Sequence, residues 1–380
     1  MSDFGAVPPG EWRMAATDLK PLTSLRFFAA VWVVLYVNWS KLAGAPTSPL
    51  VEKGYLGVEL FFVLSGFILC HVYLQKFGEG RLNYNGFLWA RLARIYPMHL
   101  ATLLSLGAMG LAASAVGLQV DPSVLAWTSL PANLTLTNAW GLAPQAGWNH
   151  ASWSISAEWF AYLCFPVFAS AAWRLRLRPR LAVLGALALL SGLYEIFPRL
   201  AGFPLDSATI AWGALRIVPC FAYGCAIYLL WRSGAVQRRQ FAQAGALFCG
   251  AAILTAGLIG ASDILIVGLF GPLVLCLAAL TSTGSRFGTG RILVYLGKIS
   301  FSMYMLCIPW SVFFVNIATR FMHTPTKQLP LSVWMVLIAG LIPLGALAYH
   351  FIEHPAQERM RALGRALPRR TQMGAMKIPA

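Results

Sequence analysis

Charged residues are scarce in this chain, and acidic residues are the scarcest of them. Only 11% of the 380 residues are charged, and Asp and Glu together number 13. A soluble globular protein usually has a charged fraction of about 25%. Because 58% of the residues are hydrophobic and the mean hydropathy is +0.66, we expect an integral membrane protein rather than a soluble enzyme.

The charges that are present are mostly positive, with a formal net charge of +16. A nucleic-acid partner is nevertheless not expected, because the cations sit in short clusters between apolar runs. That distribution is what membrane topology requires.

Metal-binding and disulfide patterns are also missing. All seven cysteines lie inside apolar runs, without CxxC spacing or loop placement, so we expect buried apolar side chains and no metal. No internal repeat, low-complexity tract or second soluble domain is evident. The first apolar run is too long for the core of a cleavable signal and is expected to remain as an anchor.

Apolar runs of roughly 17 to 25 residues predict an all-α polytopic membrane protein with about ten transmembrane helices. The sequence divides into an N-terminal cytoplasmic segment (1–21), a transmembrane domain (22–354) and a basic cytoplasmic tail (355–380). The seventh and eighth spans are separated only by residues 260–263, which requires a tight hairpin. The ten expected spans are 23–42, 54–75, 95–117, 153–172, 181–198, 208–231, 243–260, 262–282, 294–317 and 330–352.

The basic residues set the expected orientation. Most of the 29 Lys and Arg residues fall in one alternating set of connections, which places both termini on the cytoplasmic side of the cytoplasmic (inner) membrane. The connection 118–152 has no Lys or Arg and is expected to face outward. Its residues Trp127, Trp140 and Trp148 fit either an interfacial aromatic belt or an aromatic platform for a sugar.

Ionisable and polar groups inside the spans are the candidates for function, since lipid makes them costly. Arg26 lies near the start of the first span, and Glu59, Ser65 and Gly66 lie in the second. Small residues such as Ser65 and Gly66 also permit close helix packing, which is their simpler explanation. Glu59 needs a partner, and Arg216 of the sixth span is expected to pair with Glu59 or Glu158.

Further polar groups recur at helical spacing. Arg91 and Arg94 are three residues apart and so share a face; they either anchor the chain at the cytoplasmic boundary or bind phosphates of a cytosolic donor. The fourth span begins with Trp153, Ser154, Ser156 and Glu158, which fit either a capped helix start or a polar acceptor site. The ninth span contributes Tyr304.

Six short motifs follow one another over nearly the whole chain: LxxLRFFAAxWVVLY, GVELFFVLSGFIL, ARLARIYP, WSISAEW, LGKISFSMYM and FIEHP. In this order they resemble the membrane-bound acyltransferase 3 family. The resemblance implies an O-acyltransferase that moves an acyl group, usually acetyl, from cytosolic acyl-CoA to a hydroxyl of a surface or exported glycan. It implies no metal, and its partners are acyl-CoA, the glycan acceptor and the lipid bilayer.

The same resemblance suggests roles for the polar residues. Arg26, Arg91 and Arg94 would bind the CoA phosphates or orient the thioester. The acceptor end would be lined by Glu59, Ser65, Trp153, Ser154, Ser156, Glu158 and Tyr304. Among the residues of both sets, Arg26, Glu59 and Glu158 are the catalytic candidates.

Two positions depart from the family pattern. A histidine thought to be catalytic follows the family arginine by eleven residues, and here that position is Val37; the ninth-span motif often ends in histidine, and here it is Cys307. Position 37 lies about 20° around the helix from Arg26 and roughly 16 Å along it, but valine can neither take a proton nor hold an acyl group. The activity of this exact sequence is therefore in question.

Three explanations remain for Val37: an engineered inactive variant, a natural enzyme that uses another base, or a relative that only binds or moves its ligands. His71, His99 and His150 are candidate replacement bases, and Cys307 is a candidate acyl carrier. The alternative from another class is a transporter or flippase for a glycan or lipid, which would use the same buried charges as a substrate path.

Overall fold

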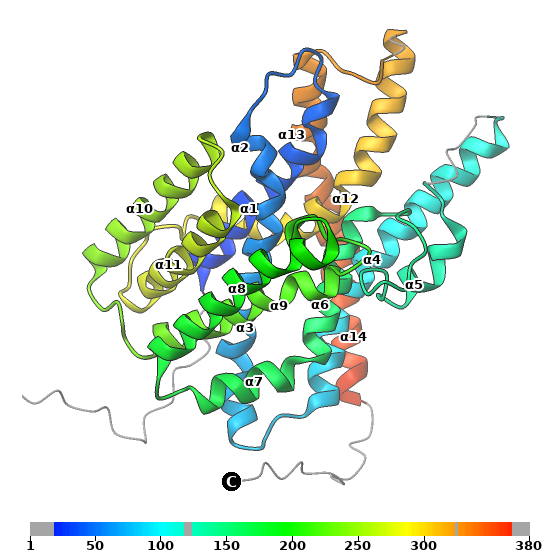
Figure 1. Ribbon diagram of the computed structural model, residues 1–380. Coiled ribbons are helices and arrows are strands. Elements are labelled where there is room, and N and C mark those ends of the chain that lie inside the picture. The colour runs from blue at the N-terminus through cyan, green and yellow to red at the C-terminus, as the bar shows by residue number, and fades with distance from the viewer. Residues whose placement is uncertain (1–18, 118–123, 324–325, 367–380) are drawn as a thin grey trace, which may run out of the picture.

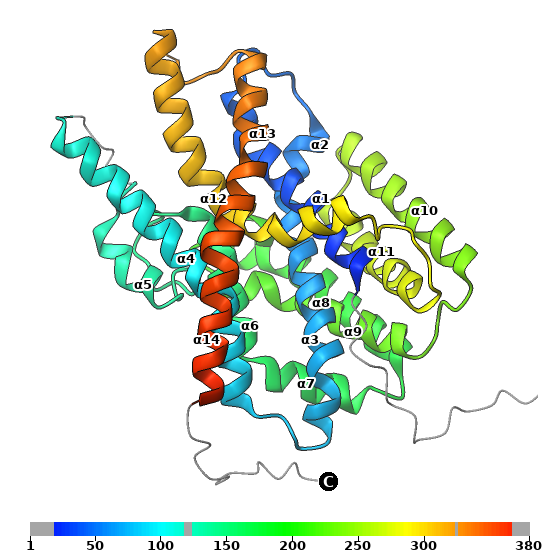
Figure 2. The same cartoon turned by 180° about the vertical axis from the view of Figure 1, so that it is seen from behind.

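The structure, a computed structural model, describes residues 19–117, 124–323 and 326–366. Over these residues the chain is an all-α polytopic membrane protein, as its sequence predicts (Figures 1 and 2). In that part of the chain, nine segments are long and apolar enough to cross a membrane. They contain the helices α1 (Lys20–Asn38), α3 (Gly57–Gly78), α4 (Tyr84–Ala115), α8 (Pro179–Ala201), α9 (Gly213–Arg232), α10 (Arg239–Leu258), α11 (Asp263–Ser282), α12 (Arg291–Met322) and α13 (Leu331–Ala348).

The remaining predicted span, 153–172, is a bent pair of helices. These are α6 (Trp153–Leu163) and α7 (Phe165–Arg174), and the break between them turns the chain by 57°. Pro166 lies in the first turn of α7, where its missing N–H and fixed φ favour a new helix start over a continuous one. Counted as one span, the pair gives ten crossings.

Several boundaries differ from those expected. The helices α4 and α12 extend beyond the predicted spans 95–117 and 294–317, because hydropathy does not register their polar ends. Asn83 caps the start of α4 by accepting a hydrogen bond from the Gly86 N–H at 3.0 Å. The predicted tight hairpin is present, since α10 ends at Leu258 and α11 begins at Asp263.

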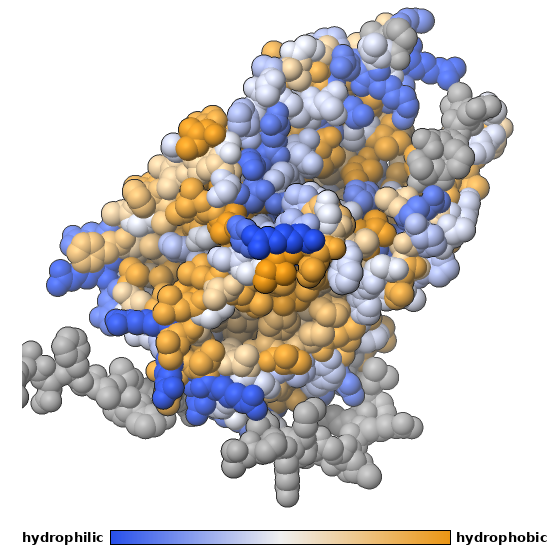
Figure 3. Space-filling model, in the orientation of Figure 1, coloured by the Kyte–Doolittle hydropathy of each residue, from blue (hydrophilic) through white to orange (hydrophobic). Residues whose placement is uncertain are grey.

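The C-terminal span also continues further than expected. A π-helical turn, Tyr349–Glu353, joins α13 to α14 (His354–Ala366), which covers much of the expected cytoplasmic tail; residues 367–380 lie outside the described residues. Two short helices, α2 (Pro49–Glu52) and α5 (Leu130–Leu134), lie in connections. Figure 3 shows apolar side chains gathered over α8, α10 and α11, with hydrophilic ones along the lower edge.

Glycine contacts hold the centre of the bundle together. A Cβ added at Gly66 of α3 would lie 2.1 Å from the carbonyl oxygen of Phe221, and one added at Gly224 of α9 would lie 2.0 Å from that of Val63. The two backbones therefore touch, as small residues allow in membrane helices. This contact fixes which face of α3 turns away from α9.

Candidate functional site

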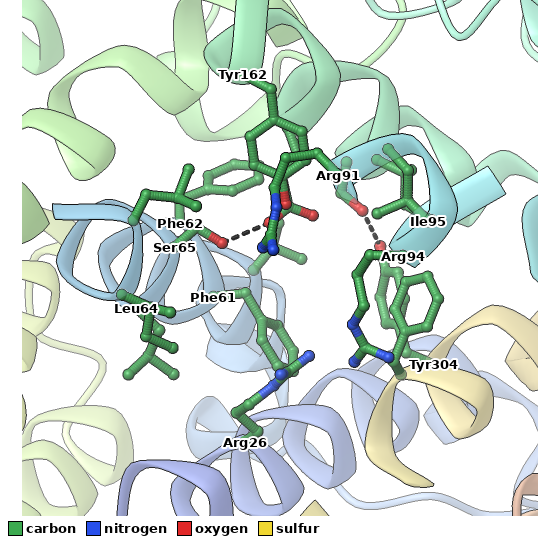
Figure 4. Close-up of a pocket in the computed structure, with 17 residues that line it drawn as sticks. Arg26, Phe61, Phe62, Leu64, Ser65, Arg91, Arg94, Ile95, Tyr162 and Tyr304 are labelled. Carbon is green, nitrogen blue, oxygen red and sulfur yellow. Dashed lines mark hydrogen bonds between the residues drawn. The ribbon is translucent and has the colours of Figure 1, made fainter. Parts of the chain in front are cut away.

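A cavity of about 110 Å³ lies where α1, α3, α4, α6 and α12 meet (Figure 4). It has both cationic and hydroxyl groups in its wall, between aromatic and aliphatic side chains. The residues that line it are Arg26, Val58, Phe61, Phe62, Leu64, Ser65, Ile68, Leu69, Arg91, Arg94, Ile95, Ser154, Ile155, Glu158, Tyr162, Phe301 and Tyr304.

Three arginines from two helices reach the cavity. The Cζ atom of Arg26 lies 5.9 Å from the centroid of the Phe61 ring, and its buried Nε has no hydrogen-bond partner. Arg91 donates to the Tyr73 hydroxyl at 3.4 Å. Across the described residues, neither Arg26 nor Arg91 has a carboxylate partner.

Arg94 is the exception, because it forms an ion pair with Glu353. The other oxygen of Glu353 accepts a hydrogen bond from Ser302 at 2.5 Å, so this carboxylate is held by two helices. Arg94 is thereby fixed in position, whereas the charges of Arg26 and Arg91 are left for water or a ligand to solvate.

Hydroxyl groups and one carboxylate form another part of the wall. Ser65 donates to Glu158 at 2.5 Å, and the hydroxyls of Ser154 and Tyr304 lie 2.7 Å apart (Figure 4). The Tyr304 hydroxyl also lies 2.9 Å from the carbonyl oxygen of Ala151. Ser154 and Glu158 are four residues apart on α6, which brings both to the same face.

Glu59 and Trp153 do not line this cavity. Arg216 donates from Nε to Glu59 at 2.5 Å and from Nη1 to the carbonyl oxygen of Ala208 at 3.1 Å, and its Cζ lies 4.5 Å from the Trp153 ring centroid. Both members of the ion pair are fully buried, with side chains 2% and 0% exposed. The expected pairing of Arg216 with Glu59 is confirmed.

Ser156 also lies outside the cavity lining. Its hydroxyl accepts from the Ala139 N–H at 3.0 Å and donates to the carbonyl oxygen of Leu136 at 2.8 Å. It therefore ties α6 to the preceding long connection.

The tryptophans of that connection differ in how far they are exposed. Trp148 is 6% exposed and packs with Leu103 and Leu125, whereas Trp140 donates to the carbonyl oxygen of Ser156 at 3.1 Å. Trp127 is 57% exposed, and its ring lies edge-to-face with that of Trp148, with 5.1 Å between the centroids.

Position 37 belongs to α1 but not to the cavity wall. Because α1 is helical from Lys20 to Asn38, Val37 lies on the Arg26 side of the helix about three turns away, where it packs against apolar neighbours. The adjacent Asn38 is buried and lies 3.3 Å from Cys307 Sγ.

None of the candidate histidines lines the cavity. His99 is buried, with Nε2 2.8 Å from the carbonyl oxygen of Asn133. His71 packs edge-on against Tyr228 and Trp231. In residues 19–117, 124–323 and 326–366, no three His, Cys, Asp or Glu side chains come together as metal ligands would.

Sequence reasoning missed the role of Glu353, which lies in the FIEHP motif just after the last expected span. An acid inside the FIEHP motif was the available signal, but its partner Arg94 is 259 residues away. It also missed Tyr162 and Phe301, since aromatic side chains in a span give no sign of which face they occupy.

Comparison with known proteins gives the family. The sequence model described as "Acyltransferase domain" matches residues 21–350. The chain is 27% identical to "Acyltransferase MdmB" of Streptomyces mycarofaciens over 378 residues, covering 92% of this chain and 94% of that protein.

Two further relatives are more distant or match only in part. The chain is 23% identical to "O-acetyltransferase OatA" of Staphylococcus aureus (strain NCTC 8325 / PS 47) over 377 residues, covering 90% of this chain and 57% of OatA. "Protein 2 in picA locus" of Rhizobium radiobacter is 38% identical over 100 residues, 22% of this chain and 52% of that protein. No solved structure matches the chain.

Proposed function

The chain belongs to the acyltransferase-domain family, which makes it a membrane acyltransferase, and on that premise we propose its reaction. It transfers an acyl group, acetyl in the first instance, from cytosolic acyl-CoA to a hydroxyl of a surface or exported glycan. The observation that carries the proposal is the cavity in which Arg26 and Arg91, without carboxylate partners, adjoin a carboxylate and four hydroxyl groups. The name of the OatA relative supports an O-linked acetyl product.

The donor enters from the cytoplasmic side, where the proposed orientation puts most basic residues. Arg91 and Arg94 attract its phosphates, and Arg26 lies on another helix, beside Phe61. A cavity of about 110 Å³ with aromatic walls has room for a short acyl group and favours acetyl over long chains.

Glu158 is the base in this proposal. Its oxygen already accepts a hydrogen bond from the Ser65 hydroxyl, so it is oriented to take a proton from an acceptor hydroxyl in the same place. The acceptor oxygen attacks the thioester carbonyl carbon and its proton passes to Glu158. The new C–O bond forms, the C–S bond breaks, and the CoA thiolate leaves and takes up the proton.

Arg26 supports this step as a positioned cation. Negative charge develops on the thioester oxygen in the transition state, and a guanidinium already held in position stabilises it more strongly than water does. The proposed reaction therefore needs no ionisable side chain at position 37.

The test is turnover of radiolabelled acetyl-CoA by the purified protein, with thioester hydrolysis and labelled glycan as readouts. Glu158→Gln should lower kcat by about 100- to 10,000-fold, the usual contribution of a general base, while the protein stays folded. Glu195→Gln, an exposed carboxylate on α8, is the matched control and should be neutral.

Val37→His separates the alternatives. If Glu158 is the base, wild type turns over and the histidine adds little. Activity that appears only in Val37→His would show instead that the missing histidine is the base. Glycan binding without turnover in either form would favour the transporter-like alternative.

A further inference from the structure

The helix α14 is fixed along the basic end of α4. The two lie side by side in both views of the ribbon (Figures 1 and 2). Trp89 donates from Nε1 to the carbonyl oxygen of Met360 at 2.6 Å, and a Cβ added at Gly364 would lie 2.3 Å from the Trp89 ring. This contact depends on the α14 backbone, so packing rather than charge determines where the helix lies.

This packing brings like charges together. Arg361 directly follows Met360, which Trp89 contacts, so it lies within electrostatic reach of Arg91 and Arg94 on the facing helix. Arg365 follows four residues later and therefore projects from the same face as Arg361, a spacing at which like charges repel. Of these four cations only Arg94 has an ion pair within the described residues.

The cluster also runs from solvent into the cavity. Arg361 is exposed, whereas Arg91 lines the cavity wall and has a buried Nε without a hydrogen-bond partner. Cations that merely set topology need only lie on one side of the membrane. Held together by packing beside the cavity, they instead favour a multiply charged anion, because a phosphate relieves their repulsion and accepts hydrogen bonds from several of their N–H groups.

We infer that α14 completes a phosphate site in which Arg361 and Arg91 together hold the phosphomonoester at the nucleotide end of the acyl donor. The inference rests on the proposed function, because it takes the donor to be acyl-CoA. It assigns a binding role to a helix that the sequence indicated only as a basic tail. The long arm of CoA then places the thioester deeper in the cavity.

Adenosine 3′,5′-bisphosphate tests this site without any acyl chemistry. Its binding to the full-length protein is measured by calorimetry in nanodiscs of phosphatidylcholine. Arg361→Gln should raise its Kd roughly tenfold, as expected for a charge-assisted contact that is partly exposed. Arg361→Lys should recover part of the affinity.

Arg359→Gln is the matched control. It removes the same charge from the same helix, but residue 359 lies about 200° around the axis from residue 361 and so on the opposite face. Its Kd should equal that of wild type. Equal losses in the two variants, or no loss in Arg361→Gln, would overturn the inference.

Two further measurements identify the molecule that supplies the phosphate and test the phosphate site separately from the proposed acyl transfer. Arg361→Gln should weaken CoA more than dephospho-CoA, which lacks the 3′-phosphate. An unchanged bisphosphate Kd together with weaker association with phosphatidylglycerol would assign Arg361 to a lipid headgroup and refute the donor site. If the bisphosphate effect is present but acetyl-CoA is never turned over, the proposed reaction fails while the phosphate site stands.

Discussion

Two groups of charged side chains adjoin α3, the Glu59–Arg216 pair and the arginines of the cavity. They differ in whether the protein itself supplies the opposite charge. Glu59 and Arg216 neutralise each other in a buried ion pair, and Ala208 and Trp153 contact the guanidinium, although Glu59 Oε2 and Arg216 Nη2 make no hydrogen bond of their own. In the cavity, by contrast, Arg26 and Arg91 have no carboxylate partner in the described part of the chain. Burying a charge costs several kcal/mol unless an opposite charge compensates it, so the first group is neutral within the protein, whereas the half-buried cations of the second can attract an anionic ligand.

Consecutive residues divide between the two groups. Trp153 lies against Arg216, whereas Ser154 lies in the cavity beside Tyr304. An ionisable residue in a span is therefore not a site by itself. What distinguishes a site is whether protein groups or a ligand satisfy the charge.

The largest test of this contrast is Glu59→Gln. It leaves the Arg216 guanidinium buried without a counter-ion, so we expect a loss of about 3 to 5 kcal/mol in the free energy of unfolding. The measurement is the thermal unfolding midpoint in detergent, alongside the Kd for CoA of the protein that remains folded. That Kd should not change.

The double variant Glu59→Leu with Arg216→Met supplies the control. Replacing both partners of a buried pair by apolar side chains is often neutral, so most of the stability should return, and acetyl transfer with it. A double variant that is stable but inactive would show that Glu59 takes part in the reaction, as the sequence suggested.

The features that could be predicted from sequence are local ones. Apolar length identified ten spans and the hairpin at residues 260–263, because crossing a membrane depends on the segment itself. Helical spacing placed Arg91 with Arg94 and Ser154 with Glu158, and each pair lines the cavity.

Contacts between distant helices were not predictable in the same way. Arg94 and Glu353 meet only because α4, α12 and the end of α13 pack together. Whether Glu59 would face α9 or the cavity depended on how α3 is rotated. That rotation is fixed by the backbone contact at Gly66 and Gly224, which no single segment encodes.

A second, smaller test compares Ser65 with Gly66, neighbours that sequence reasoning treated as one packing pair. Gly66→Ala forces a Cβ against the Phe221 carbonyl group, which is backbone and cannot yield, so we expect a loss of about 1 to 3 kcal/mol in unfolding free energy. Ser65→Ala removes only the hydrogen bond to Glu158 and should alter kcat more than the unfolding midpoint. Equal stability losses in both would mean that Ser65 is there for packing.

The smallest expected effect is on how stability depends on pH, and it concerns an acid close to the Glu59–Arg216 pair. Asp206 lies in the connection between α8 and α9. Its burial, and after that its hydrogen bond to Asp263 of α11, raise the pKa of Asp206 from 3.8 to about 7. The positive charge of Arg216 lowers this pKa and only partly offsets the increase. Asp263 is itself held by Lys53 at 2.6 Å and by Tyr55 at 2.8 Å, and Glu59 of α3 adds further negative charge.

Between about pH 4 and pH 7 the folded protein therefore keeps a proton on Asp206 that the unfolded chain has already released. Stability must fall as the pH rises through that window, because the folded state binds more protons there. Asp206→Asn carries no titrating group and should flatten the dependence of the unfolding midpoint on pH, whereas Glu195→Gln on the exposed surface should leave it unchanged. If Asp206→Asn keeps the wild-type dependence of the unfolding midpoint on pH, the proton is not held at this carboxyl. The surroundings of the Glu59–Arg216 pair would then be more accessible to water than the contacts of Asp206 indicate.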